Sequence, residues 1–458
     1  MKYVSTRGAA PVLDFTDVLV GGLASDGGLY VPDSWPALPP VTSTAPYAET
    51  AAAVISPFVD AHTDADLLSM CRDAYATFRH DAVCPLVQLT NDTWLLELFH
   101  GPTLAFKDVA LQLVGRMLDA ELQRRGERLA IVVATSGDTG SAAIEACRDR
   151  PSIDVFVLHP EGRVSEVQRR QMTTVLAPNV HNIALEGTFD DCQDMVKALF
   201  ADAAFRKEHH LGALNSINWG RVVAQVVYYV TSALSLGATD TRPVSFVVPS
   251  GNFGNVFSGW VAQQMGLPIA QLVIGSNRND ILTRAVNTGR MDIAEVVPTM
   301  SPSMDIQVSS NFERLLFELN GRDGGLTAEQ MGVFRARGHL ALEADQLREL
   351  HATFAAASVD EEHTLEQIAR THSESGVMVD PHTAVGLAAA RAVERDPDIP
   401  VIALATAHPA KFPDAVERAI GVRPALPEHL ADLFDRPERY SVVANDLDAV
   451  KAAIRNSA

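Results

Sequence analysis

The chain has 458 residues, of which 47% are hydrophobic and 21% charged, a balance typical of a globular protein of two or three domains. Its net charge of -20 argues against nucleic-acid binding through phosphate neutralisation, but a small anionic substrate responds to the local field and is not excluded. The chain has four cysteines without a C-x-x-C pair, no apolar leader and no apolar run of about 18 residues, which predicts a soluble cytoplasmic protein that does not bind a membrane.

The first part of the chain differs in composition from the rest. Residues 15–40 are rich in Gly and Pro, and two helical patterns follow in residues 48–61 and 66–78. We therefore expect a small N-terminal module over residues 1–85 and a larger body over residues 86–458.

In the larger body, short apolar runs alternate with helical periods, which predicts parallel sheets with helices on both faces. We expect strands at residues 93–99, 129–135, 153–160, 180–187, 244–250, 270–277 and 400–409. We expect helices at residues 108–126, 141–150, 164–175 (opened by Ser165), 189–205, 220–234, 256–266 and 380–394. The strand pattern fades at about residues 281–376, which predicts a mostly helical region there. Motifs for dinucleotides, nucleoside triphosphates, zinc hydrolysis and serine hydrolysis are absent from the sequence, and no metal site is predicted.

Two glycine turns follow predicted strands. In "VVPSGNFGNVF" (247–257) we expect Gly251 and Gly254 to adopt backbone angles closed to other residues, so that several N–H groups meet beside a positive helix end and bind a phosphate. The alternative is an ordinary turn with Asn255 as helix cap. "VATSGDTGSAA" (133–143) predicts the same geometry for a second anion such as a carboxylate, with a simple capped helix as its alternative.

Lys107 is one of only six lysines, against thirty-one arginines, and it follows the apolar run Leu104–Phe106 where a helical pattern begins. Burial and the positive end of a helix both disfavour a cation, so we expect a lowered pKa and an amine free to form an imine. Pyridoxal phosphate combines an imine-forming aldehyde with a phosphate. We therefore predict that Lys107 bonds to this cofactor while Gly251–Asn255 hold its phosphate; the alternative is an exposed surface lysine.

The chain resembles the threonine synthase family, in the longer type found in bacteria and fungi. The resemblance covers almost the whole sequence, and its motifs occur in the family's order: "GLASDGGLYVP", "FHGPTLAFKD", "ATSGDTGSAA", "GRVSEVQRRQM", "EGTFDDCQ", "NSINWGRVVAQ", "PSGNFGN" and "ATAHPAKFP". It implies fold type II of the pyridoxal-phosphate-dependent enzymes, the tryptophan synthase β-like α/β fold. In that fold two subdomains of parallel sheets with flanking helices follow the N-terminal module and carry the helical insertion.

The resemblance also implies roles for single residues. Lys107 matches the lysine that carries the cofactor, and Thr406 matches a hydroxyl residue near its pyridine nitrogen. The cofactor phosphate is expected at Gly251, Asn252, Phe253, Gly254 and Asn255. Residues near the substrate carboxylate and the cofactor 3'-oxygen are expected to be Thr135, Ser136, Asp138 and Thr139. Asp138 stands where most of the fold has asparagine, so the hydrogen bond it makes stays open, because an ionised carboxylate only accepts.

The implied reaction converts O-phospho-L-homoserine and water into L-threonine and phosphate. Two alternatives stay open: another eliminase, dehydratase or phosphohomoserine lyase of the same fold, and a catalytically inactive relative. The expected partner is this small-molecule substrate, and the oligomeric state is left open. Candidates for binding the leaving phosphate are Arg163, Ser165, Asn218, Arg221, Arg278 and Lys411.

Overall fold

The computed structural model describes residues 1–135 and 137–457, and the chain divides into two compact units. The first unit comprises residues 1–106 and 216–424. The second comprises residues 107–215 together with the chain from residue 425 onward. The boundary falls directly before Lys107, so the predicted cofactor lysine is the first residue of the second unit.

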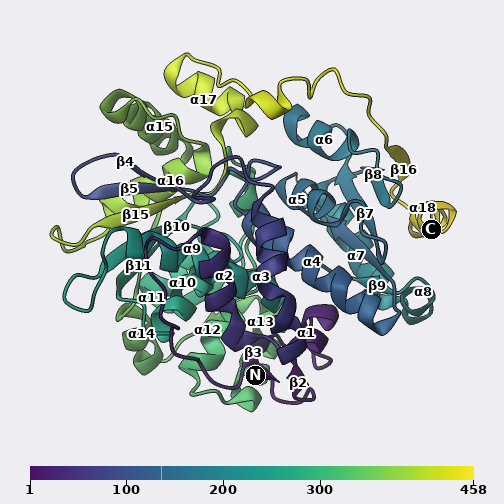
Figure 1. Ribbon diagram of the computed structural model, residues 1–458, viewed down its shortest axis with the longest axis horizontal. Helices are drawn as coiled ribbons and strands as arrows, with labels where there is room; N and C mark the ends of the chain where they lie inside the picture. The colour runs from purple at the N-terminus through teal and green to yellow at the C-terminus, as the bar shows by residue number, and fades with distance from the viewer. Residues whose placement is uncertain (136, 458) are drawn as a thin grey trace. The chain divides into compact units, whose positions relative to one another are not determined.

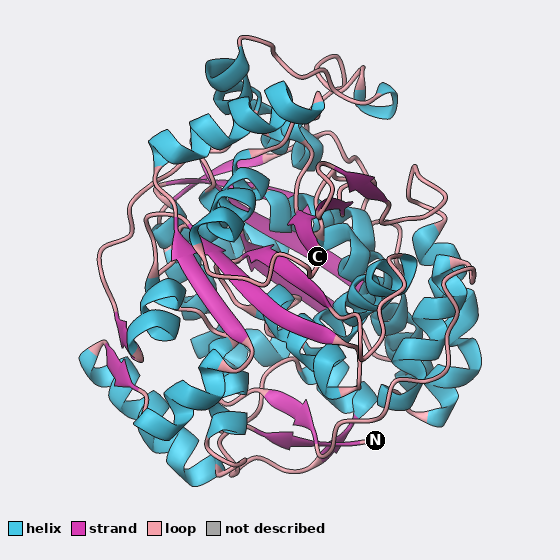
Figure 2. Cartoon of the chain, turned by 90° about the vertical axis from the view of Figure 1, so that its left-hand side faces the viewer, coloured by secondary structure: helices cyan, strands magenta, loops and turns pink. Residues whose placement is uncertain are grey.

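The first unit is built on a six-stranded sheet of order β14-β11-β10-β15-β5-β4, whose long strands are visible in Figure 2. All of its neighbours are parallel except β4 and β5, which pair antiparallel. The strands are β4 (Leu86–Gln88), β5 (Thr93–Glu97), β10 (Val244–Pro249), β11 (Ile269–Ser276), β14 (Phe354–Ser358) and β15 (Val401–Ala405). The fold class predicted from the sequence is confirmed, although β14 lies in a region where the sequence showed little strand pattern.

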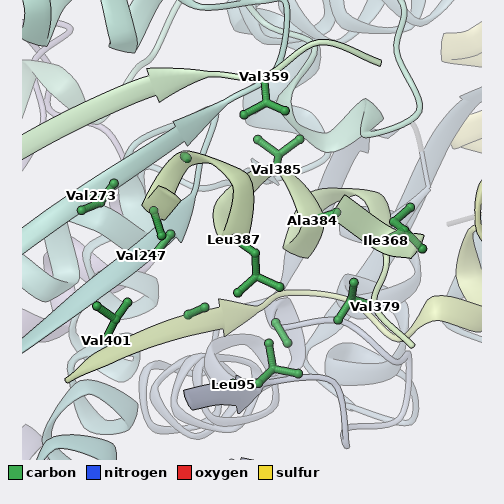
Figure 3. Packing of buried hydrophobic residues seen from close by; sticks show 14 of the residues in the cluster. Leu95, Val247, Val273, Val359, Ile368, Val379, Ala384, Val385, Leu387 and Val401 are labelled. Atoms are coloured by element: carbon green, nitrogen blue, oxygen red, sulfur yellow. The ribbon is translucent and has the colours of Figure 1, made fainter. Parts of the chain in front are cut away.

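Helices cover both faces of this sheet. Successive side chains along a strand point to opposite faces, so each strand packs against helices on both sides. Val273 of β11 belongs to an apolar cluster with Val385 and Leu387 of α16 (Figure 3). Its neighbour Leu272 lies on the other face, where a Cβ added at Gly259 of α10 would come within 3.0 Å of its side chain. The helices of this unit are α1 (Phe15–Gly21), α2 (Tyr47–Ile55), α3 (Ala61–Tyr75), α9 (Trp219–Ser235), α10 (Gly254–Gln264), α11 (Ile281–Thr288), α12 (Phe312–Leu319), α13 (Gly324–Arg337), α14 (Ala344–His351), α15 (Glu361–Ser375), α16 (Pro381–Ala392) and α17 (Pro413–Ile420).

The N-terminal residues form a three-stranded antiparallel sheet, of order β2-β1-β3, that is anchored on α9. Its strands are β1 (Lys2–Ser5), β2 (Leu13–Asp14) and β3 (Tyr30–Pro32), and a separate antiparallel pair joins β12 (Arg290–Asp292) to β13 (His339–Ala341). Trp219 donates to the Tyr3 hydroxyl at 3.0 Å, and this hydroxyl donates to the Phe58 carbonyl at 2.6 Å. A module boundary at residue 85 stays a prediction.

The second unit has a five-stranded, wholly parallel sheet of order β16-β8-β7-β6-β9, labelled in part in Figure 1. Its strands are β6 (Leu129–Ala134), β7 (Ile153–Pro160), β8 (Val180–Glu186), β9 (Leu211–Gly212) and β16 (Ser441–Ala444). Its helices are α4 (Lys107–Arg125), α5 (Asp138–Cys147), α6 (Glu166–Thr173), α7 (Phe189–Ala201), α8 (Ala203–Glu208) and α18 (Leu447–Ser457). None of the helices in the described ranges of the chain is both long and apolar enough to cross a membrane.

The helices of this unit likewise lie on both faces of its sheet, because successive side chains of a strand point to opposite faces. Phe156 and Leu158 of β7 pack with α7 and α18 in one apolar cluster. Val157 points to the opposite face, where a Cβ added at Gly140 of α5 would lie 2.9 Å from it. α4 then packs on α5 through Gly115, since a Cβ there would lie 2.6 Å from the Ala146 carbonyl oxygen. This close contact sets where α4, and with it Lys107, lies over α5.

Candidate active site

Lys107 is the first residue of α4 and is buried, with 8% of its surface exposed. Its Nζ lies 3.4 Å from Oδ2 of Asp138, the first residue of α5. The side chain is therefore not the exposed surface lysine of the alternative interpretation. A buried amine needs a partner of opposite charge, because burying an unpaired charge is costly.

Asp138 is held from its other side by α6. Gln168 donates through Nε2 to Asp138 Oδ1 at 2.8 Å, and both side chains are buried. Ser165 caps α6 as the sequence predicted, accepting from the backbone N–H of Gln168. The helix that carries Asp138 begins three residues earlier than expected, at Asp138 instead of residue 141. Asp138 thus lies in a first turn, where the helix dipole favours a negative charge.

The hydroxyl of Thr135 organises the loop that precedes α5. Its Oγ1 accepts from the backbone N–H groups of Gly137 and Gly140, each at 2.9 Å. Thr135 is buried, Thr139 is half-buried in the first turn of α5, and Ser136 lies outside the described residues. Thr135 uses its oxygen as an acceptor within the loop, so its hydroxyl hydrogen remains the part that can donate to a substrate.

The backbone of the Gly251–Asn255 loop differs from the expectation in one respect. Neither Gly251 nor Gly254 has positive φ; the left-handed residue is Phe253, with φ of 63°. Glycine suits both positions because there is little room for a side chain, and not because of φ. A Cβ at Gly251 would lie 3.1 Å from Met304 Cα, and one at Gly254 would lie 3.2 Å from Asn311 Nδ2. Phe253 tolerates its strained backbone because its ring is wholly buried.

The same loop exposes a set of unused donors. Within the described part of the chain, the backbone N–H groups of Gly251, Asn252, Gly254 and Asn255 make no hydrogen bond to the protein. They lie at the end of β10 and the beginning of α10, where the helix dipole is positive. Unpaired N–H groups in a buried or half-buried turn are costly unless a ligand accepts from them. The loop therefore fits a phosphate dianion.

Asn255 acts within the loop and does not simply cap α10. Its Oδ1 accepts from the Ser250 hydroxyl at 2.6 Å, its Nδ2 donates to the Pro249 carbonyl at 3.0 Å, and Tyr229 donates to its carbonyl at 2.7 Å. The side chain that was expected to contact the cofactor is thus used to tie the end of β10 to the start of α10.

We expect Asn255→Ala to destabilise the protein by about 1–3 kcal/mol, because buried groups at Pro249 and Ser250 lose their partners. Cofactor affinity should fall with it, since the loop donors lose their fixed direction. Thermal melting and a fluorescence titration with the cofactor measure the two effects. Gln263→Ala is the matched control: it removes a side-chain bond to the Ile269 carbonyl at the far end of α10 and should leave affinity unchanged. Unaltered affinity in Asn255→Ala would contradict this role.

Thr406 follows β15 and lies beside the segment that leads into Lys107. Its carbonyl accepts from the backbone N–H of Phe106 at 2.8 Å, and His408 donates to the Leu104 carbonyl at 3.0 Å. The Thr406 hydroxyl makes no hydrogen bond with any residue in the described ranges, although the residue is buried. It is therefore free to bond to a ligand atom.

The six candidates for the leaving phosphate fall into two groups. Arg163, Ser165 and Arg278 are exposed, whereas Asn218, Arg221 and Lys411 are buried. Asn218 caps α9 and also donates to the Leu19 carbonyl, and Lys411 donates to the Thr103 carbonyl at 2.7 Å. Burial lowers the pKa of Arg221 to about 10. The structure gives Asn218 and Lys411 internal partners, and a role for any of the six in phosphate binding stays a prediction.

The segment 299–311 supports the glycine loop, a function that the sequence did not reveal. Ser309 donates to the Gly251 carbonyl at 2.7 Å, and the backbone N–H of Asn311 donates to the Asn252 carbonyl at 3.2 Å. With its carbonyls bound from outside, the loop can turn its N–H groups toward a ligand. Gln168 was likewise missed, although it lies in a quoted motif, because the motif did not show which residue its side chain reaches.

Models of three protein families match the chain along almost its whole length. They are described as "Threonine synthase N terminus" over residues 2–75, "Pyridoxal-phosphate dependent enzyme" over residues 80–357 and "Threonine synthase, C-terminal" over residues 383–454.

Relatives and solved structures agree with these families. A threonine synthase from Pseudomonas aeruginosa is 55% identical, and the match covers 99% of this chain and 98% of that protein. A threonine synthase from Brucella melitensis, solved with pyridoxal phosphate bound, is 51% identical, with a TM-score of 0.96 over 100% of this chain and 99% of the other. The yeast threonine synthase structure is 39% identical, with a TM-score of 0.94 over 100% and 98% of the two chains. On these grounds the chain belongs to the threonine synthase family of pyridoxal-phosphate-dependent enzymes.

Proposed function

We propose that this chain is a threonine synthase that converts O-phospho-L-homoserine and water into L-threonine and phosphate. The observation that carries the proposal is the buried amine of Lys107 opposite the Asp138 carboxylate, in a chain whose whole length matches threonine synthases. A lysine in such surroundings suits a proton transfer that must run in both directions within one turnover.

We assign three sets of residues a role toward pyridoxal phosphate. The N–H groups of Gly251, Asn252, Gly254 and Asn255, which have no protein partner among the described residues, would hold its phosphate. The Thr406 hydroxyl would bond to its ring nitrogen, and Lys107 would carry it through its amine. A neutral hydroxyl at the ring nitrogen does not force protonation of the ring as a carboxylate would. When bound, the cofactor supplies a carbonyl that bonds to amines and a ring that accepts the electron pair left by a departing substrate proton.

Lys107 then acts as an acid and a base. Its amine would take the proton from the substrate Cα and hand protons back to the carbon skeleton. Asp138 stabilises the ammonium form of Lys107 while the amine holds a proton. We propose that Thr135 and Thr139, which lie before and within the first turn of α5, would donate to the substrate carboxylate. Ser136 is expected to share this role but lies outside the described residues.

The products test the reaction. Purified protein with pyridoxal phosphate and O-phospho-L-homoserine should release one threonine for each phosphate, because water is added after phosphate leaves. Amino-acid analysis and a phosphate assay on the same samples measure the ratio. A 2-oxo acid released with the phosphate would show an eliminase or lyase and overturn the proposal. A cofactor-loaded protein without turnover would instead show an inactive relative.

We also propose a cytoplasmic location. All four cysteines are free and buried, which supports a reducing compartment, where thiols persist. Burial raises the pKa of Cys84 and of Cys147 to about 12, so these thiols are protonated and unreactive.

A further inference from the structure

We propose that Gln168 is a positioning residue that keeps Asp138 an ionised acceptor turned toward Lys107, with Ser165 holding the other end of the Gln168 amide. The inference rests on the proposed function, because it concerns the group that faces the proton-carrying amine. It also answers the question left open by the aspartate at position 138, where an asparagine would have offered a donor.

Each oxygen of the Asp138 carboxylate has its own donor. Gln168 Nε2 donates to Oδ1 at 2.8 Å, and Lys107 Nζ lies 3.4 Å from Oδ2. The rotation of an aspartate carboxyl about its last bond is otherwise weakly restricted. A donor at each oxygen restricts this rotation, and both donors stabilise the form of the carboxyl group that only accepts. The arrangement therefore favours the ionised carboxylate.

Ser165 holds the end of the Gln168 amide that faces away from Asp138. Its Oγ accepts from the backbone N–H of Gln168 at 3.3 Å and lies 2.9 Å from Gln168 Oε1. Because an amide oxygen only accepts, the serine hydroxyl must donate to it. A reversed amide would place two acceptors together at Asp138, whereas the Ser165 hydroxyl can donate or accept and suits either end of the amide. The Asp138 carboxylate thus selects the orientation in which Nε2 faces it, and Ser165 donates to the oxygen at the other end.

Gly137 provides independent support, because its Cα lies so close to the Gln168 amide that a side chain would collide with it. A Cβ added at Gly137 would lie 2.4 Å from Gln168 Cδ and 2.6 Å from Nε2, and Gly137 has φ of 143°. Only glycine leaves room for the amide at that point. Gln168 is 3% exposed, so water cannot easily replace its bond to Asp138.

The consequence concerns pH. A donor to the ionised form of a carboxylate stabilises that form, so its loss makes the carboxylate harder to ionise. A protonated Asp138 no longer stabilises the ammonium of Lys107, and the lysine loses a partner in the proton transfer.

The test compares three variants with the wild-type holoenzyme. Gln168→Met fills nearly the same volume but donates nothing; kcat should fall about 10- to 100-fold, as is usual for a lost supporting bond behind a reacting group, while KM changes less than about 3-fold. The pH at which kcat falls on the acid side should be higher than in the wild type. The midpoint of the pH titration of the visible band of bound cofactor should rise with it.

Gln168→Glu gives the opposite signature. Its carboxylic acid can donate to Asp138 only while it holds a proton, so activity should recover toward low pH and fall as the two carboxylates come to share the site as anions. Gln123→Met is the matched control, because Gln123 makes the same kind of amide bond, to Asp119 Oδ2 at 2.8 Å, on the exposed side of α4. Its activity and pH profile should match the wild type.

The outcomes separate the two claims. If the wild type makes threonine and Gln168→Met keeps the kcat and pH profiles of Gln123→Met, the positioning role is wrong and the proposed function stands. If the wild type makes no threonine, the proposed function fails; the band titration of Gln168→Met, which needs no turnover, still decides whether Gln168 acts on Asp138. A band that titrates as in the wild type would overturn the inference.

Discussion

Replacing Lys107 with alanine is expected to lower turnover by more than about 1,000-fold, because one side chain supplies both the covalent bond to the cofactor and the proton transfer at the substrate. The residue is buried and faces Asp138, so water cannot easily take its place. Lys107→Ala should still bind pyridoxal phosphate reversibly, since the N–H groups of the Gly251–Asn255 loop are untouched by the change.

Borohydride reduction followed by peptide mass spectrometry measures the bond directly. The reduced adduct should appear on the peptide that contains Lys107 in the wild type and be missing from Lys107→Ala. Lys197→Ala is the control, because Lys197 lies on the surface of α7 with 72% of its side chain exposed and pairs with nearby Asp194. An adduct on any other side chain of the wild type would disprove the assignment.

Replacing Gly251 with valine should weaken cofactor binding by about 30-fold or more, as expected when one or two charge-assisted hydrogen bonds are lost. A Cβ at this position would lie 3.1 Å from Met304 Cα and 3.2 Å from the Ile306 side chain, and valine adds two further methyl groups. Either the loop or the segment 299–311 must move, and the N–H groups then point away from the phosphate.

The affinity is measured by titrating cofactor-free protein with pyridoxal phosphate and following the visible absorption. Gly332→Val makes the same change in α13, where an added Cβ would meet no atom within 4 Å, and it should bind the cofactor like the wild type. Circular dichroism shows whether each variant is folded. A folded Gly251→Val with normal affinity would disprove the proposed phosphate site.

Local patterns in the sequence were sufficient for most of the architecture. Alternating apolar runs and helical periods identified most strands and helices of the two parallel sheets, and Ser165 was recognised as a cap from its place before a helical pattern. Position in the chain also indicated Lys107 and the two glycine loops. These features lie within windows of about ten residues, where periodicity, capping preferences and glycine content operate.

Two elements differ from the expectation. β14, with the sequence FAAAS, carries a weak strand pattern and becomes a strand because it pairs along β11. Residues 189–205, expected as one helix, form α7 and α8, since Asp202 caps a new helix by accepting from Ala204 and Phe205. Tertiary pairing and local capping override the average preference of a longer segment.

The sequence by itself indicated candidates for chemistry, a rare lysine at a helix start and two glycine loops after strands, and the resemblance to threonine synthases added Thr406. Only the tertiary structure decided what each of them contacts. Gln168 reaches Asp138 because α6 packs on α5, and Asn255 is used inside its own loop because Pro249 and Ser250 lie within its reach. Side-chain partners depend on which elements are neighbours in space, and residues far apart in a sequence do not carry that information in their local pattern.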